Sequence, residues 1–137
     1  MNDKSILVVD DEIENIWALS HTLKPKYTVY SAANGHDAID AAEKHQPDII
    51  LLDIIMSGMD GYDVIKALKS SEKTKNIPVI FLTSKNDPES ETKGLSYGAV
   101  DYIFKPFSRS LLLKRVEIHL LLDMQKRKAN ESDNNCL

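Results

Sequence analysis

The chain has 137 residues, of which 42% are hydrophobic and 28% charged, and a formal net charge of -4. This is the length of one domain with at most a short tail, and no apolar run approaches the roughly 20 residues that span a membrane. The acidic balance argues against direct nucleic-acid binding, and the only cysteine, Cys136, cannot form a disulfide within the chain, which favours the reducing cytoplasm.

Short continuous apolar runs alternate along the chain with stretches of helical spacing. In chain order we predict a strand at Ser5–Val9, a helix at Ile13–Leu23, a strand at Thr28–Tyr30, a helix at Gly35–Lys44, a strand at Ile49–Leu52, a helix at Tyr62–Leu68, a strand at Pro78–Leu82, a helix at Pro88–Tyr97, a strand at Tyr102–Phe104 and a helix that Ser108 caps and that runs to about Lys128. Continuous apolar runs of this length are typical of strands buried on both faces. The alternation predicts an α/β fold: a single doubly wound, five-stranded parallel sheet with five helices.

The last helix and the tail differ from the rest of the chain. Leu111, Ile118 and Leu122 exceed what one packed stripe needs, so either they lie under loops or they form a surface for a partner or a second copy. Residues 129–137 are polar and rich in Asn and Asp. We therefore expect one domain over residues 1–122, with a helix extension and a disordered tail over residues 123–137.

Polar side chains follow four of the predicted strands at the point where each strand stops. They are Asp10 and Asp11, Asp53, Thr83 and Lys105. In an open parallel sheet the carboxyl ends of the strands lie at one edge, where ligand sites form. We therefore expect these five side chains to converge.

Three carboxylates at one edge repel each other, by about 4 kcal/mol for a pair ~4 Å apart at an effective dielectric near 20. A cation should offset this repulsion, and oxygen ligands without nearby His or Cys favour Mg²⁺, with Mn²⁺ as the alternative. Lys105 adds a fixed positive charge and Thr83 a hydroxyl. Such a set suits phosphoryl transfer, for which aspartate is a known covalent acceptor.

Each residue taken alone also has an ordinary interpretation. Asp10 and Asp11 could cap a helix, Asp53 could be a solvated carboxylate, and a lysine before proline is usually on the surface. Only their joint placement favours a site. Four histidines share no metal-ligand spacing and are predicted to be surface residues: His21, His36, His45 and His119.

These motifs, in this order, resemble the response-regulator receiver domain of two-component signalling over about residues 4–122. The matching residues are the acidic pair Asp10-Asp11, Asp53, the loop residues Met56, Met59, Asp60 and Gly61, Thr83, the run Gly98–Tyr102 and Lys105-Pro106-Phe107. The resemblance implies a flavodoxin-like sheet of order 2-1-3-4-5. The chain departs from the family pattern at Ser57, where proline is common in the family.

The resemblance also implies roles for the site residues. Asp53 would accept a phosphoryl group, and Thr83 and Lys105 would contact its oxygens. Asp10, Asp11, Asp53 and the backbone carbonyl of Ile55 would hold Mg²⁺. Thr83 and Tyr102 would act as the switch, and the Lys105-Pro106 peptide bond would be cis. The apolar Ile55 side chain predicts slow self-dephosphorylation, with a phosphoryl lifetime of minutes or longer.

By the same resemblance, the donor would be a histidine kinase or a phosphotransfer protein, and the chain would not be an enzyme acting on a separate substrate. The face made by the fourth helix, fifth strand and fifth helix would control an output domain or partner protein, or form a homodimer, with no direct role for nucleic acid or membrane.

Two other functions use similar folds. A haloacid-dehalogenase-type phosphohydrolase would place its nucleophile after the first strand, with a second aspartate two residues on. Here Asp10 is followed by Asp11 and Glu12. A flavodoxin-like cofactor binder would need neutral backbone donors at that position, and three acids there would repel a phosphate.

Overall fold

The computed structural model describes residues 4–135, with side chains as far as residue 130. Its elements are β1 (Ser5–Val9), α1 (Ile13–Leu23), β2 (Thr28–Ala32), α2 (Gly35–His45), β3 (Ile49–Leu52), α3 (Gly61–Lys69), β4 (Val79–Thr83), α4 (Pro88–Ser96), β5 (Asp101–Phe104) and α5 (Arg109–Asn135). The five strands form one parallel sheet in the order β2-β1-β3-β4-β5. The predicted fold class and strand order are confirmed.

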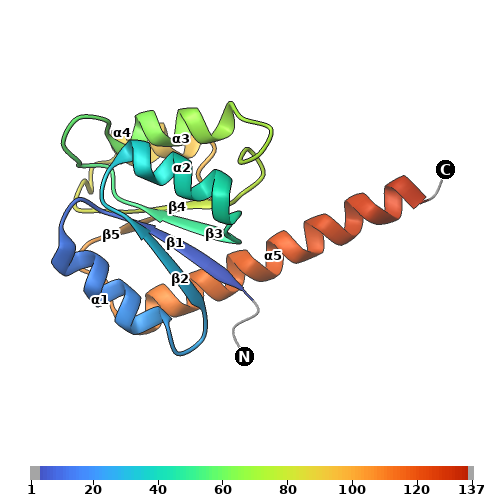
Figure 1. Ribbon diagram of the computed structural model, residues 1–137, viewed down its shortest axis with the longest axis horizontal. Helices are drawn as coiled ribbons and strands as arrows, with labels where there is room; N and C mark the ends of the chain where they lie inside the picture. The colour runs from blue at the N-terminus through green and yellow to red at the C-terminus, as the bar shows by residue number, and fades with distance from the viewer. Residues whose placement is uncertain (1–3, 136–137) are drawn as a thin grey trace.

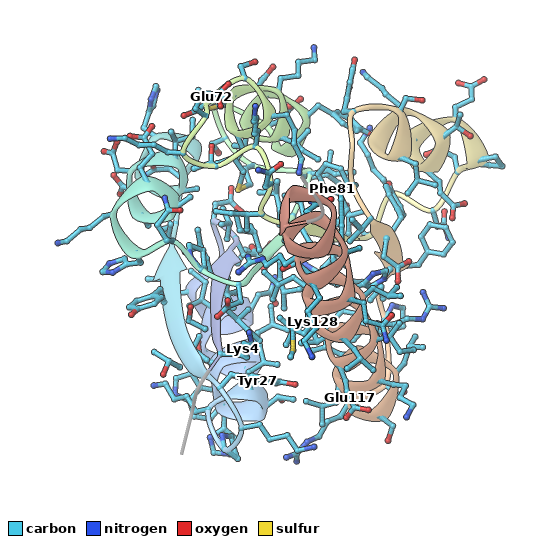
Figure 2. All side chains as sticks on the ribbon, turned by 90° about the vertical axis from the view of Figure 1, so that its right-hand side faces the viewer. Lys4, Tyr27, Glu72, Phe81, Glu117 and Lys128 are labelled. Atoms are coloured by element: carbon cyan, nitrogen blue, oxygen red, sulfur yellow. The ribbon has the colours of Figure 1, made fainter. Side chains whose placement is uncertain are left out.

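Two helical layers cover the sheet, with α1 and α5 on one face and α2, α3 and α4 on the other (Figure 1). Alternate side chains of a strand serve the two layers: Ile49 and Leu51 of β3 pack with α1 and α5, while Ile50 and Leu52 pack with α2 and α3. Figure 2 shows the layers from the side, with Phe81 of β4 labelled in the interior. Burial on both faces explains why the strands are continuous apolar runs.

Local signals define most element ends. Asp87 caps α4 by accepting from Ser90 N at 2.9 Å, and Ser108 Oγ accepts from Leu111 N at 3.0 Å at the start of α5. Gly98 follows α4 with a φ of +104°, which favours glycine. Two strands are longer than predicted: β2 continues to Ala32 because its last residues pair with the end of β1, and β5 begins at Asp101, which pairs with Ile80.

The longest helix, α5, continues to Asn135 and so passes the helix end predicted near Lys128, while the disorder expected of the tail stays a prediction. An i,i+4 ion pair between Asp123 and Arg127, at 3.0 Å, stabilises the part of α5 just before Lys128. Figure 1 shows α5 projecting beyond the sheet. Cys136 and Leu137 lie outside the described residues, and the domain limit at residue 122 stays a prediction.

The apolar face of α5 is divided. Leu112, Val116 and Leu120 are buried against the sheet, whereas Leu111, Ile118 and Leu122 are 38%, 40% and 53% exposed. Of the two interpretations of these surplus residues, burial under loops is therefore wrong. Within residues 4–135, no helix is both long and apolar enough to cross a membrane.

Candidate functional site

The ends of β1 and β3 bring two carboxylates together. Val9 and Leu52 are paired in register, and Asp53 N donates to Val9 O at 3.0 Å. Asp10 and Asp53, the next residue along each strand, are therefore neighbours at the carboxyl edge of the sheet. Both are buried, with 2% and 8% of their surface exposed.

Lys105 joins the two carboxylates from the other side of β4. Its Nζ lies 3.2 Å from Asp10 Oδ2 and 3.4 Å from Asp53 Oδ2. The backbone of Lys105 is held by a 2.8 Å hydrogen bond to Thr83 O, and the Lys105-Pro106 peptide bond is cis. The sequence-predicted convergence thus holds for Asp10, Asp53 and Lys105.

One ammonium between two buried carboxylates leaves the site negatively charged. Burial raises the pKa of Asp53, and Asp10 raises it further, although Lys105 opposes both effects. Burial also works against the charge of Lys105, but Asp53 and Asp10 outweigh it and raise the Lys105 pKa. The lysine is therefore firmly charged, while Asp53 remains undercompensated, and a further cation would be stabilised here.

Asp11 lies beside this pair but is exposed, and its Oδ2 accepts from Ser57 N at 3.1 Å. Within the part of the chain that the structure describes, no three His, Cys, Asp or Glu side chains form a ready-made metal cage. Mg²⁺ rarely uses such a cage, because it takes one or two carboxylates and keeps several waters. The donor chemistry and the excess negative charge therefore fit Mg²⁺.

Thr83 and Tyr102 both attach to one residue of the loop between β4 and α4. Thr83, fully buried, accepts from Lys85 N at 3.3 Å through its Oγ1. The Tyr102 hydroxyl donates to Lys85 O at 2.7 Å, and burial raises its pKa, which keeps it protonated as a donor. The two predicted switch residues therefore share a contact, although they come from different strands.

Two supporting residues had no assigned role from the sequence. Asn15, in the first turn of α1, donates from Nδ2 to Asp10 Oδ2 at 3.1 Å. At Gly61 a Cβ would collide with the carbonyl oxygen of Asp53, so the loop after Asp53 packs directly on the start of α3. In the sequence, the feature that indicates a role for Asn15 is its amide side chain one helical turn after the acidic pair Asp10-Asp11.

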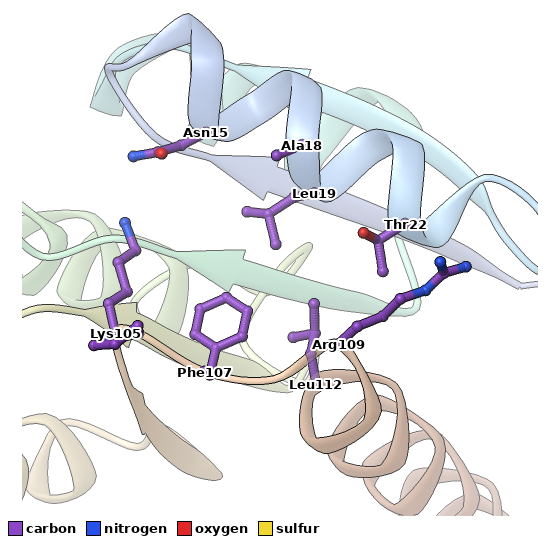
Figure 3. A pocket seen from close by; sticks show the side chains of 9 residues that line it. Asn15, Ala18, Leu19, Thr22, Lys105, Phe107, Arg109 and Leu112 are labelled. Atoms are coloured by element: carbon purple, nitrogen blue, oxygen red, sulfur yellow. The ribbon is translucent and has the colours of Figure 1, made fainter.

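A cavity of about 410 Å³ adjoins the site between α1 and the start of α5. Figure 3 shows Asn15, Leu19 and Thr22 on one wall and Phe107 and Leu112 on the other, with the Lys105 side chain at one end. It offers an apolar surface beside the cluster of Asp10, Asp53 and Lys105.

One histidine is not the surface residue expected. His119 on α5 has a side chain only 15% exposed, and its Nε2 lies 3.0 Å from Asp101 Oδ2. Arg115 contacts both Asp101 oxygens, at 2.9 and 2.8 Å. Burial raises the Asp101 pKa, but these hydrogen bonds outweigh burial and hold it below its usual range. The group ties β5 to α5.

A model of the response regulator receiver domain matches residues 6–117. The chain belongs to this family. It is a signalling domain of two-component systems, and the expected membership is confirmed.

Known relatives agree with this assignment. The chemotaxis protein CheY4 of Vibrio cholerae is 35% identical, with a TM-score of 0.79 over 83% of this chain and 96% of that one. The receiver domain of a sensor histidine kinase from Pseudomonas aeruginosa is 29% identical, with a TM-score of 0.79 over 85% and 97%. That receiver is described with a magnesium ion in its active-site cleft.

A curated relative is much longer. A probable cyclic di-GMP phosphodiesterase of Vibrio cholerae is 46% identical over 116 residues, which are 85% of this chain but 26% of the relative. The chain thus spans about a quarter of that protein.

Proposed function

We propose that this domain is a switch in which Asp53 accepts a phosphoryl group from the phosphohistidine of a histidine kinase or phosphotransfer protein. The observation that carries the proposal is the placement of Lys105 Nζ between Asp53 and Asp10, at 3.4 and 3.2 Å. Stability alone does not favour two buried carboxylates that share one ammonium. Such an arrangement suits a reaction that needs charge balance around an acceptor carboxylate.

In the transfer, an Asp53 carboxylate oxygen forms a bond to phosphorus as the bond from phosphorus to the donor imidazole nitrogen breaks. The imidazole leaves with the electron pair of that bond. Lys105 balances charge on the phosphoryl oxygens, and Thr83 donates its hydroxyl to one of them. Asp10, Asp11, Asp53 and the Ile55 carbonyl would hold Mg²⁺, which supplies charge neutralisation. The cavity between α1 and α5 suits contact with the donor protein.

The response would pass through Thr83 and Tyr102, because both contact Lys85. A Thr83 hydroxyl drawn toward the phosphoryl group gives up its bond from Lys85 N. The loop then moves relative to Tyr102 and changes the face of α4, β5 and α5. This face carries exposed Phe104, Leu111 and Ile118, which suits contact with an output domain, a partner protein or a second copy.

On this proposal the domain catalyses only its own phosphorylation and dephosphorylation. The test is to incubate the full chain with Mg²⁺ and a small acyl phosphate and to measure the intact mass. We expect a mass increase of one phosphoryl group in the wild type, and no increase in Asp53→Asn or with a chelator present. Lys114→Met is a suitable control, because Lys114 is exposed on α5 and pairs with Glu117 of the same helix, not with Asp53.

Absence of an adduct with acyl phosphates and with phosphorylated histidine kinases would overturn the proposal. So would an equal adduct on Asp53→Asn, which would place the phosphoryl group on another residue.

A further inference from the structure

The helix α4 is held to the domain by few contacts. Of its nine residues only Gly94 is buried, and Leu95 is 43% exposed. The neighbouring helix α3, with the same number of residues, buries Tyr62, Val64, Ile65 and Leu68. A helix that buries no apolar side chain of its own has low local stability, so each remaining contact matters.

Part of the attachment is close backbone packing on two rings. A Cβ at Gly94 would lie 3.0 Å from the ring of Phe81 and 3.2 Å from the ring of Tyr102. Phe81 belongs to β4 and Tyr102 to β5, so α4 rests on the sheet through this glycine. Any larger side chain there would push the helix outward.

A second part of the attachment comes from Tyr62 of α3. Its hydroxyl donates to the backbone carbonyl of Ser90 in α4 at 3.1 Å. Lys93 of α4 places its Nζ 4.4 Å from the centroid of the Tyr62 ring, a cation–π contact. Tyr62 thus contacts α4 twice, once through its oxygen and once through its ring.

Tyr62 is also connected to the acceptor loop. It follows Gly61, whose backbone N donates to Ile54 O at 2.9 Å and which packs on the carbonyl of Asp53. Asp60 closes the first turn of α3 with a capping box. The loop after Asp53 is therefore fixed to the turn that carries Tyr62, and a movement of that loop displaces the Tyr62 side chain.

We propose that Tyr62 is a positioning residue that holds α4 against the domain and connects the loop after Asp53 to α4. The first half of this statement concerns the unphosphorylated domain and stands by itself. The second half rests on the proposed function, because it needs phosphorylation of Asp53 to move the loop.

The first test is amide hydrogen exchange in the unphosphorylated full chain, with Tyr62→Phe compared against Tyr97→Phe. The Tyr97 ring also packs on Tyr62, with centroids 5.8 Å apart, but among the described residues its hydroxyl has no hydrogen-bond partner. Loss of one neutral hydrogen bond predicts about fivefold faster exchange in α4 for Tyr62→Phe, with β3 and β4 unchanged. Equal exchange in the two variants would overturn the proposal, and so would faster exchange throughout the domain.

Gly94→Ala provides a second variant that leaves Tyr62 in place. Its Cβ would lie 3.0 Å from the Phe81 ring and 3.2 Å from the Tyr102 ring, so a shift of a few tenths of an ångström at this contact should raise exchange in α4 while the strands keep their protection. Unchanged exchange in α4 would show that the helix is held by something other than these contacts, which would contradict the proposal.

The second test measures how much phosphorylation changes exchange in α4. In the wild type, reaction with an acyl phosphate should clearly change the exchange rate in α4. In Tyr62→Phe the change should be at least twofold smaller when intact mass shows the same phosphoryl occupancy. An equal change in both proteins would refute the connection. Failure of Asp53 to take up phosphoryl at all would refute the proposed function while leaving the first test in force.

Discussion

Removal of the Lys105 ammonium should destabilise the metal-free domain far more than removal of a surface lysine. Each contact of its Nζ, at 3.2 and 3.4 Å, corresponds to a gross attraction of about 5 kcal/mol at an effective dielectric of 20. Desolvation of the ammonium offsets much of this, and the Lys105 side chain is 24% exposed. Loss of one partner of a fully buried pair costs about 3–5 kcal/mol, so we expect about 2–3 kcal/mol for Lys105→Met.

The assay is urea unfolding at pH 7 with a chelator, followed by circular dichroism. The matched control is Lys114→Met, whose 3.5 Å pair with Glu117 is largely exposed and should contribute less than about 0.5 kcal/mol. Adding Asp53→Asn to Lys105→Met should recover part of the loss, since one buried carboxylate then disappears. If Lys105→Met unfolds at the same urea concentration as Lys114→Met, the electrostatic account of the site is wrong.

Three further predictions concern other parts of the domain. Asp101→Asn should lower the free energy of unfolding by about 1–2 kcal/mol at pH 7. Because the pKa of Asp101 is lowered in the folded domain, this difference should persist above the ordinary aspartate pKa of 3.8 and vanish as the pH falls through the folded pKa; a constant difference in acid unfolding curves would contradict it. Gly61→Ala should slow phosphorylation of Asp53, measured by intact mass, because it displaces the loop after Asp53. The control is Gly58→Ala: Gly58 has a φ of +73° and open space around it, so this change should lower the free energy of unfolding by about 1 kcal/mol without slowing phosphorylation. Equal phosphorylation rates in the two variants would refute this prediction. The phosphorylated protein should persist for minutes or longer in Mg²⁺ buffer, and Ile55→Ala should shorten that time severalfold. Loss of the phosphoryl group from the wild type within seconds would contradict this prediction.

The sheet and the cluster of polar residues at its carboxyl edge could be predicted because they depend on strong, local signals. Continuous apolar runs in five places indicate buried parallel strands, and parallel strands bring their carboxyl ends to one edge. Asp10, Asp53 and Lys105 therefore could be placed together before any contact was known, although 95 residues separate the first from the last.

Side-chain partners between elements could not be predicted in the same way. The helical spacing of α5 does not tell whether the His119 side chain faces solvent or contacts the Asp101 carboxylate, as it does in the structure. The Tyr62 hydroxyl reaches α4 only because α3 and α4 lie side by side on the sheet, which no local pattern records. The structure continues α5 to Asn135 although the polar composition of residues 129–135 predicts disorder, because a polar composition does not by itself exclude a helix.

The central claim is that Asp53 is the phosphoryl acceptor, and chemical trapping tests it most directly. The domain is treated with an acyl phosphate and Mg²⁺, then reduced with borohydride, which converts an aspartyl phosphate to homoserine, and the modified peptide is sequenced by mass spectrometry. We predict homoserine at position 53 and at no other aspartate. Homoserine at position 10 or 11, or its absence from a protein that carries a phosphoryl group, would contradict the account.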